Sequence, residues 1–123
     1  MSTINAANIT DGTTSVPTGY VVNGSAKAWI NFNGTGTVST RDSFNLSSLV
    51  DNGTGNYSAN YTSNMSANDY CVVTAVGQTS PFPIAQAYLQ GVKTTHVQLN
   101  TAQPGTADYN LGLVTSASFG DLA

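Results

Sequence analysis

Apolar and polar residues alternate in several short stretches of the chain. In the first clear case, Ala28, Ile30 and Phe32 are apolar, and Asn31 lies between two of them. A spacing of two is typical of a β-strand with one face buried. Trp29 falls on the polar side of this pattern. We therefore predict a strand here with the tryptophan side chain on its outer face.

A glycine-rich turn then predicts a hairpin. The alternation in Phe44–Leu49 shifts phase across residues 47 and 48, which indicates a β-bulge or a strand end. Asp51–Gly55 supplies glycines where a tight turn needs positive φ. Alternation resumes from Asn56 to Thr62. We predict that Phe44–Leu49 and Asn56–Thr62 pair as an antiparallel hairpin.

Further strands are predicted on both sides of this hairpin. Tyr20–Val22 is apolar and short. Tyr70–Val76 is apolar on both faces, which favours a central strand that is covered on both sides. Its residue Cys71 is the only cysteine in the chain, and we expect a buried thiol. Tyr109–Ser116 reads as the last strand.

The second half of the chain predicts one more hairpin and an exposed loop. Ile84–Gln90 and Thr95–Asn100 alternate, and Gly91–Thr94 is the expected turn between them. In this pattern Tyr88 and His96 point outward. The prolines at 81 and 83 cannot donate ladder hydrogen bonds, so residues 77–83 form a loop that displays Phe82.

These segments predict an all-β protein. Short strands separated by glycine and proline turns are typical of an antiparallel β-sandwich, which we place at residues 20–123. Residues 1–19 contain few apolar positions and are expected to form an extended N-terminal arm or linker. At 123 residues the chain fits one domain.

Composition narrows the functional classes. Charged residues make up 7% of the chain, against about 25% in ordinary soluble proteins. Lys27, Arg41 and Lys93 are too few to form the basic patch that a nucleic acid partner requires. Such a polar, uncharged surface suits hydrogen bonding to sugars and packing between identical subunits. Few charges also leave strand edges unprotected in a monomer, which favours an oligomer.

Candidate catalytic and metal groups are sparse. A glycosidase needs two paired carboxylates, but each aspartate lies in or beside a turn signal, where Asp usually bonds the local backbone. One histidine and one cysteine on separate strands give no metal-ligand spacing. We therefore expect no enzyme activity, no cofactor and no metal. The chain shows no signal peptide and no apolar run of about 20 residues, so we expect no membrane insertion.

Three strings carry a family resemblance. They are A-K-A-W-I-N-F-N-G-T-G, R-D-S-F-N-L-S-S-L and D-N-G-T-G-N-Y, which span Ala26 to Tyr57. Together with the residues up to Val76, they resemble a domain found at the C-terminal ends of tail-fibre and related virion proteins of tailed bacteriophages, especially aquatic phages. The resemblance implies a homotrimeric β-structured fibre module. It carries over no catalytic residue.

The half of the chain outside the resemblance holds the candidate ligand-binding residues Phe82, Tyr88 and His96. An aromatic ring can stack on a sugar face while Gln and Asn amides read its hydroxyl groups. We expect Gly77–Asp108 to form the surface distal to the arm. Trp29 has two interpretations, a structural contact with a neighbouring subunit or strand and a sugar platform, and the first is favoured because it lies in the shared motif.

The predicted function follows from these two halves. We expect a bacteriophage tail-fibre or receptor-binding module that recognises a host cell-surface glycan, located in the virion after assembly in the host cytoplasm. Its partners would be two further copies of itself, other virion structural proteins and a bacterial surface glycan. The alternative is a purely structural virion component, such as a head fibre, a capsid decoration or a connector, without receptor binding. A spike enzyme is the third and least favoured class.

Overall fold

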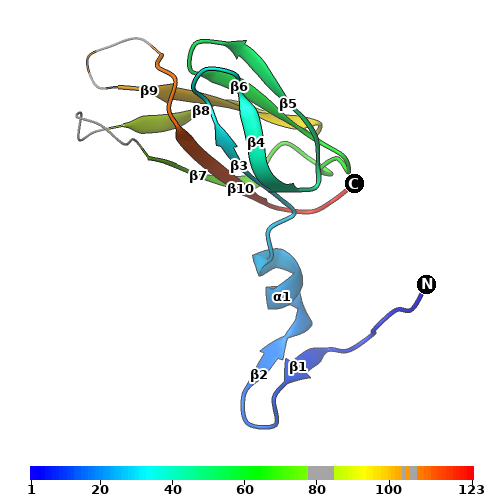
Figure 1. Cartoon of the computed structure of the whole chain (residues 1–123). Helices are drawn as coiled ribbons and strands as arrows, with labels where there is room; N and C mark the ends of the chain where they lie inside the picture. The colour runs from blue at the N-terminus through cyan, green and yellow to red at the C-terminus, as the bar shows by residue number, and fades with distance from the viewer. Residues whose placement is uncertain (78–84, 104, 106–107) are drawn as a thin grey trace.

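The computed structural model describes residues 1–77, 85–103, 105 and 108–123. It shows a two-sheet sandwich with an N-terminal arm that extends from one end (Figure 1). All strand pairs are antiparallel. The first sheet has the order β4 (Ser39–Phe44), β3 (Ala28–Asn33), β10 (Leu113–Phe119), β7 (Cys71–Gly77). The second sheet has the order β5 (Leu46–Gly53), β6 (Asn56–Tyr61), β9 (His96–Ala102), β8 (Gln86–Val92).

The core lies between the two sheets. Alternate residues of each inner strand point into it, among them Ile30 and Phe32 from β3 and Tyr57 and Leu99 from the second sheet. The rings of Phe32 and Tyr57 meet edge to face with centroids 4.9 Å apart. Since both sheets bury one face against the other, the predicted antiparallel β-sandwich is confirmed.

The predicted hairpin is also confirmed, with one correction. β5 and β6 pair across a turn at residues 53–55, where Gly53 and Gly55 have φ of 127° and 66°. A register shift between Leu46 and Ser48 marks the expected bulge. Phe44, however, belongs to β4 and pairs with Trp29 in the other sheet.

Asn45 separates β4 from β5, although Phe44 and Leu46 on either side of it continue the alternation in the sequence. It is the residue at which the chain crosses from the first sheet to the second, with a φ of 56°. Its side-chain amide donates to the carbonyl oxygens of Lys27 and Ser63, both at 3.0 Å, and its Oδ1 accepts from the Ser63 amide at 2.8 Å. Asparagine tolerates this left-handed backbone better than most residues. The chain therefore crosses between the two sheets at a single asparagine, where a glycine is the usual residue.

The arm is more structured than predicted. β1 (Asn8–Thr10) and β2 (Ser15–Pro17) form a small hairpin whose turn is closed by Asp11, which accepts from the amides of Thr13 and Thr14 at 2.9 and 2.7 Å. Both bonds stabilise the ionised carboxylate and so lower the pKa of Asp11, and the bond from Thr14 has the larger effect.

Tyr20–Val22, predicted as a strand, lies instead in the helix α1 (Thr18–Gly24). A helix of seven residues spans about two turns, so its 3.6-residue period leaves almost no trace in the sequence. The Lys27 ammonium donates to the carbonyl oxygens of Val22 and Ser25, where a cation stabilises the end of a helix. This contact fixes the connection between α1 and β3.

The predictions for Tyr70–Val76 and Cys71 were wrong. β7 is an edge strand, and its alternate residues Cys71, Val73 and Ala75 are exposed, while Val72 and Val76 pack against the core. An exposed apolar face gives the same sequence pattern as a face that is covered. The sequence alone cannot distinguish the two, because hydrophobicity on both sides of a strand does not reveal what lies against its outer side.

Two further boundaries differ from those expected. The last strand is Leu113–Phe119, since the bond from the Tyr109 amide to the Thr101 carbonyl keeps the preceding residues in a loop. β8 continues through Gly91 and Val92 by means of a bulge, so the turn before β9 comprises residues 93–95. Within the described residues, no helix is long and apolar enough to cross a membrane.

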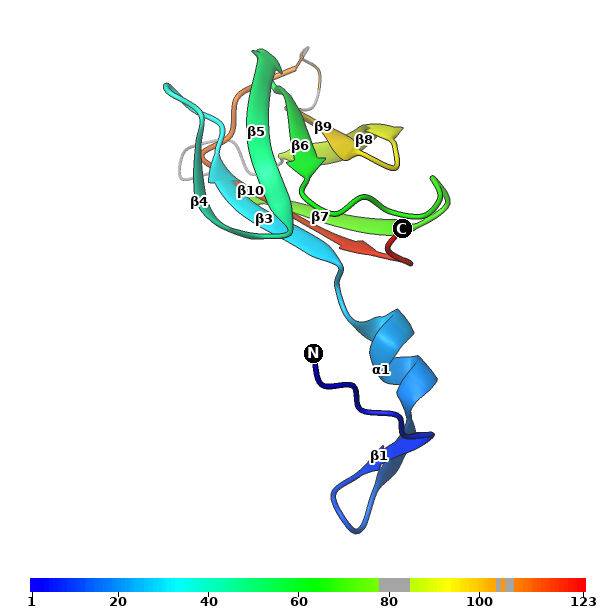
Figure 2. The same ribbon diagram turned by 90° about the vertical axis from the view of Figure 1, so that its right-hand side faces the viewer.

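The sandwich has two distinct ends. The arm end holds Asn45, the 93–95 turn and the C-terminus, where the Ala123 amide donates to the Asn64 carbonyl at 2.9 Å. The far end holds the 53–55 turn and Gly34, whose amide donates to the Leu111 carbonyl at 2.9 Å. Figure 2 shows α1 and the β1–β2 hairpin extending away from the arm end.

Candidate functional site

The outer face of the second sheet is lined by uncharged polar side chains, and we call it the polar face. Its residues alternate with the buried ones along the strands, so that Asn56 and Ser58 of β6 lie beside Gln98 of β9. Gln90 of β8 and Asn52 of β5 extend the face to both edges. Alternation of this kind is the ordinary consequence of a strand with one buried face.

Three amides at the centre of the polar face bind one another. Gln98 Nε2 donates to Gln90 Oε1 at 2.7 Å and to Asn56 Oδ1 at 3.0 Å, and Asn56 Nδ2 donates to Gln90 Oε1 at 3.0 Å. Asn52 Nδ2 joins this cluster at Asn56 Oδ1, 3.2 Å, and at Ser58 Oγ, 2.8 Å. These bonds fix the side-chain orientations before any ligand arrives, which lowers the entropic cost of binding.

A second cluster lies toward the far end of the same face. The Tyr88 hydroxyl donates to Asp108 Oδ1 at 2.6 Å, and Asn100 Nδ2 donates to Asp108 Oδ2 at 2.9 Å. Tyr88 remains 45% exposed. The hydrogen bond to Asp108 is the main cause that raises the pKa of Tyr88 above its ordinary value. The ring is therefore held at its hydroxyl end while nearly half of the residue stays exposed.

Asn100 differs from its neighbours because it is buried. Its side-chain oxygen, Oδ1, has no hydrogen-bond partner among the described residues, although the amide nitrogen is paired with Asp108. An unpaired buried acceptor costs about 1–3 kcal/mol. Tyr88 is the partner of Asn100 across the β8–β9 strand pair.

The structure separates the predicted site residues. Tyr88 and His96 both lie on the second sheet, as expected, but His96 begins β9 at the arm end. Tyr88 pairs with Asn100, four positions farther along β9, so the two sites are about 13 Å apart along the strand. His96 Nδ1 lies 3.0 Å from Thr95 Oγ1. Phe82 lies outside the described residues.

The amides were only partly anticipated. Alternation puts Gln90 and Gln98 on the outer side of their strands, but it does not indicate that they bond to each other and to Asn56. Asp108 was assigned to local turn chemistry and instead joins Tyr88 to Asn100. No sequence signal marks these pairings, because they join β6, β8, β9 and a loop.

Charge is almost absent from this surface. Lys27 is engaged at the end of α1, and the Arg41 guanidinium donates to the carbonyl oxygens of Phe32 and Gly112 at 2.8 and 2.6 Å. Lys93 lies in the turn at the arm end. Among the described residues, no group of three or more His, Cys, Asp or Glu side chains is placed to hold a metal ion.

Comparison of the chain with protein-family models, with curated proteins and with solved structures gives no match.

Proposed function

We propose that this chain is a receptor-binding module of a bacteriophage fibre that recognises a host cell-surface glycan through its polar face. The observation that carries the proposal is the ordered surface formed by Tyr88 and the bonded amides of Asn56, Gln90 and Gln98. The proposed activity is binding without catalysis, and the proposed location is the virion.

The chemistry of the polar face is appropriate to sugars. Amide and hydroxyl groups each donate and accept, as sugar hydroxyl groups do, and a partly exposed tyrosine ring provides an apolar surface for the C–H face of a pyranose. The face is also rigid, since its side chains are held by hydrogen bonds on paired strands. Single-site affinity of such an open surface is weak, so useful adsorption depends on several copies acting together.

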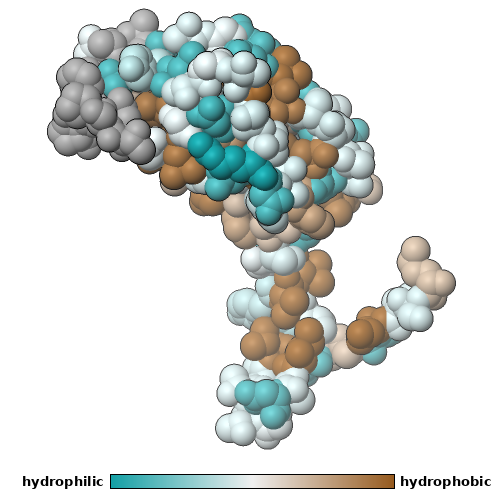
Figure 3. Space-filling model, viewed as in Figure 1, coloured by the Kyte–Doolittle hydropathy of each residue, from teal (hydrophilic) through white to brown (hydrophobic). Residues whose placement is uncertain are grey.

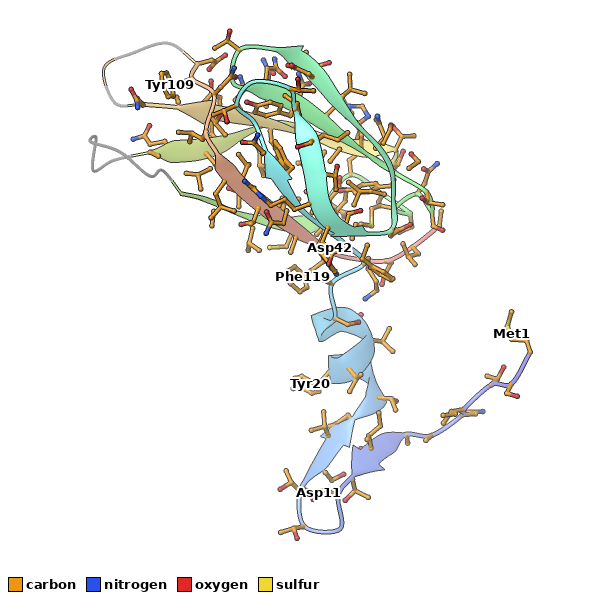
Figure 4. The ribbon with its side chains drawn as sticks, in the orientation of Figure 1. Met1, Asp11, Tyr20, Asp42, Tyr109 and Phe119 are labelled. Carbon is orange, nitrogen blue, oxygen red and sulfur yellow. The ribbon has the colours of Figure 1, made fainter. Side chains whose placement is uncertain are left out.

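A homotrimer would supply those copies, and the resemblance to tail-fibre domains supports this assembly. Its arm end would join other virion structural proteins, and its far end would face the cell. Tyr88 and Asp108 lie toward that far end, as does Tyr109 in the view of Figure 4.

One observation favours the alternative of a purely structural virion component. Gln90, Gln98 and Asn56 already satisfy much of one another's hydrogen-bonding capacity. A hydrogen-bond network that forms without a ligand can serve only to hold the edge strand β8 in place. A structural face of this kind would bind no glycan.

A glycan array separates the two functions. The fluorescently labelled chain would be applied to immobilised bacterial lipopolysaccharides and capsular polysaccharides, with Tyr88→Ala as the test variant. Leu113→Ala removes an apolar side chain of similar exposure from the outer face of the first sheet and is the matched control. We expect the wild type and the control to bind the same glycans and Tyr88→Ala to lose at least tenfold in affinity. Absence of binding by the wild type would reject the receptor function in favour of the structural one.

A further inference from the structure

The outer face of the first sheet carries a row of apolar side chains. Strand pairing places Phe44, Trp29, Ala117 and Val73 side by side across β4, β3, β10 and β7. Phe44, Trp29 and Val73 are exposed to 54%, 37% and 52%. We call these four residues the apolar band. It lies at the arm end, because Trp29 is the second residue of β3 and Phe44 the last of β4.

The band is hollowed at its centre. The small side chain of Ala117 separates Trp29 from Val73, and these residues line a depression with Thr115 and Ala75. A depression beside a tryptophan can accept a protruding side chain, which a flat sheet cannot. None of the four band residues carries a charge.

The arm presents the complementary surface. None of the residues of α1 is buried, and Tyr20, Val21 and Val22 are 74%, 44% and 55% exposed. Figure 3 shows several hydrophobic residues along the arm, between more hydrophilic ones. A helix of seven residues is not stable alone in water, so its folding requires a surface to pack against.

The arm does not cover the band of its own chain. The link between α1 and β3 comprises residues 25–27, and Lys27 fixes it through bonds to Val22 and Ser25. With this link in place, α1 extends away from the sandwich (Figures 1 and 2). The band and α1 are therefore two unburied apolar surfaces, without charged side chains, that belong to one chain.

We propose that α1 of one copy docks onto the apolar band of a second copy, with Tyr20 in the hollow over Ala117. This inference deepens the homotrimer of the proposed function by naming the contact, and it does not depend on the glycan. The contact joins two different surfaces. Repeated with the three-fold rotation of the proposed homotrimer, it closes a ring in which each copy gives its arm to one neighbour and receives the arm of another.

Aromatic side chains supply part of the area that this contact needs. An aromatic side chain offers about 150–250 Å² for burial, so the exposed parts of Tyr20, Trp29 and Phe44 contribute roughly 300 Å², summed over both partners. A standard interface buries about 1,600 Å² over both partners, so these side chains supply about a fifth of that area. Val21, Val22 and Val73 add to the aromatic part, and each copy takes part in two such contacts.

Cysteine crosslinking between two labelled populations tests the contact. One population carries Val21→Cys and Cys71→Ser, and the other is the wild type with a mass tag and its natural Cys71. Cys71 is exposed on β7 next to the band residue Val73. After mixing in denaturant and refolding, a short bis-maleimide is expected to join tagged to untagged chains. Thr13→Cys with Cys71→Ser, at the tip of the arm hairpin, is the matched control and is expected to crosslink at least fivefold less.

Trp29 gives a second readout, because it is the only tryptophan. Covering the band shifts its fluorescence to shorter wavelength, and the double variant Val21→Ser and Val22→Ser should reverse that shift. If mixed crosslinks are no more frequent than in the control and Trp29 emission does not respond to the arm, the docking inference is wrong. Sedimentation equilibrium would then show whether the trimer itself exists. A trimer would mean that the copies assemble through another contact, and a monomer would reject both the docking of α1 and the homotrimer.

Discussion

The hydroxyl of Tyr57 donates to the carbonyl oxygen of Gly34 at 3.0 Å, and this bond joins the second sheet to the loop that follows β3. The same hydroxyl lies 2.9 Å from Asn110 Oδ1, so its single proton is shared between the two acceptors, and Asn110 Oδ1 also accepts from the Gly55 amide. Three segments that are distant in sequence therefore meet at the far end around one buried tyrosine. Any side chain on Gly34 would occupy the place of that hydroxyl.

Gly34→Ala is expected to destabilise the protein by about 1–3 kcal/mol. A Cβ atom at this position would lie 2.4 Å from the Tyr57 hydroxyl and 2.9 Å from the Leu111 carbonyl oxygen. Chemical denaturation measures the loss. Gly112→Ala, where the closest atom would be 3.9 Å away, is the control and should change the free energy of unfolding far less. Equal effects of the two variants would contradict the steric explanation.

The turn glycines 53 and 55 should differ in their tolerance. Both have positive φ, which costs about 1–3 kcal/mol for a residue with a side chain. At Gly55 a Cβ would also lie 2.5 Å from the Thr101 carbonyl oxygen, whereas at Gly53 nothing lies within 4 Å. We expect Gly55→Ala to lower the melting temperature clearly more than Gly53→Ala. A larger decrease for Gly53→Ala would show that Gly55 is not packed against Thr101 of β9.

Replacement of Asn45 should separate backbone strain from hydrogen bonding. Asn45→Ala and Asn45→Gly both lose the side-chain bonds to Lys27 and Ser63. Only alanine also pays for the φ of 56°, about 1–2 kcal/mol. We expect both variants to be less stable than the wild type, with alanine the less stable of the two in urea unfolding. Glycine at or above wild-type stability would mean that the side-chain bonds contribute nothing.

Alkaline pH should destabilise the fold through its buried tyrosines. Burial raises the pKa of Tyr70, and burial likewise raises that of Tyr57. The folded state therefore keeps these protons after the unfolded state has released them, so the stabilisation is complete below about pH 10 and decreases as the pH rises above it. Melting temperatures measured from pH 7 upward should be level and then decrease. Tyr70→Phe should weaken this dependence.

The separation of Tyr88 from His96 gives a prediction for the proposed glycan site. A ligand that stacks on Tyr88 and contacts the central amides does not need His96, which lies about 13 Å away along β9. We expect His96→Ala to retain binding within about twofold while Tyr88→Ala loses it, as measured by biolayer interferometry on the glycan selected from the array. Equal losses of affinity in the two variants would mean that the ligand contacts the whole length of β9.

Local pattern predicted the parts of the fold in which one face is buried and the other is polar. Alternation in residues 56–61 and 96–100 gave both the strands and their inward residues, and the glycines at 53 and 55 gave the turn. It could not show which sheet a strand joins. β7 was placed at the centre because its outer residues are apolar, and the crossing at Asn45 was missed because asparagine replaces the expected glycine.

The candidate site was predictable only in outline. Strand parity placed Tyr88 on the outer side, and the rarity of charge indicated an uncharged polar surface. The bonds from Tyr88 to Asp108 and from Gln98 to Asn56 depend on register between strands that are not adjacent in sequence. A one-residue change in that register would move every one of these side chains to the opposite face.

The arm and the last residues of the chain lie on the same side of the sandwich. The helix α1 enters β3 there, and the last residues are held there by the bridge between Met65 and Leu122. A tether placed on either terminus would consequently leave the opposite pole unobstructed. Immobilisation on a sensor surface, or fusion to a display scaffold, should thus present Tyr88 to solution in one uniform orientation, whichever terminus is chosen for attachment.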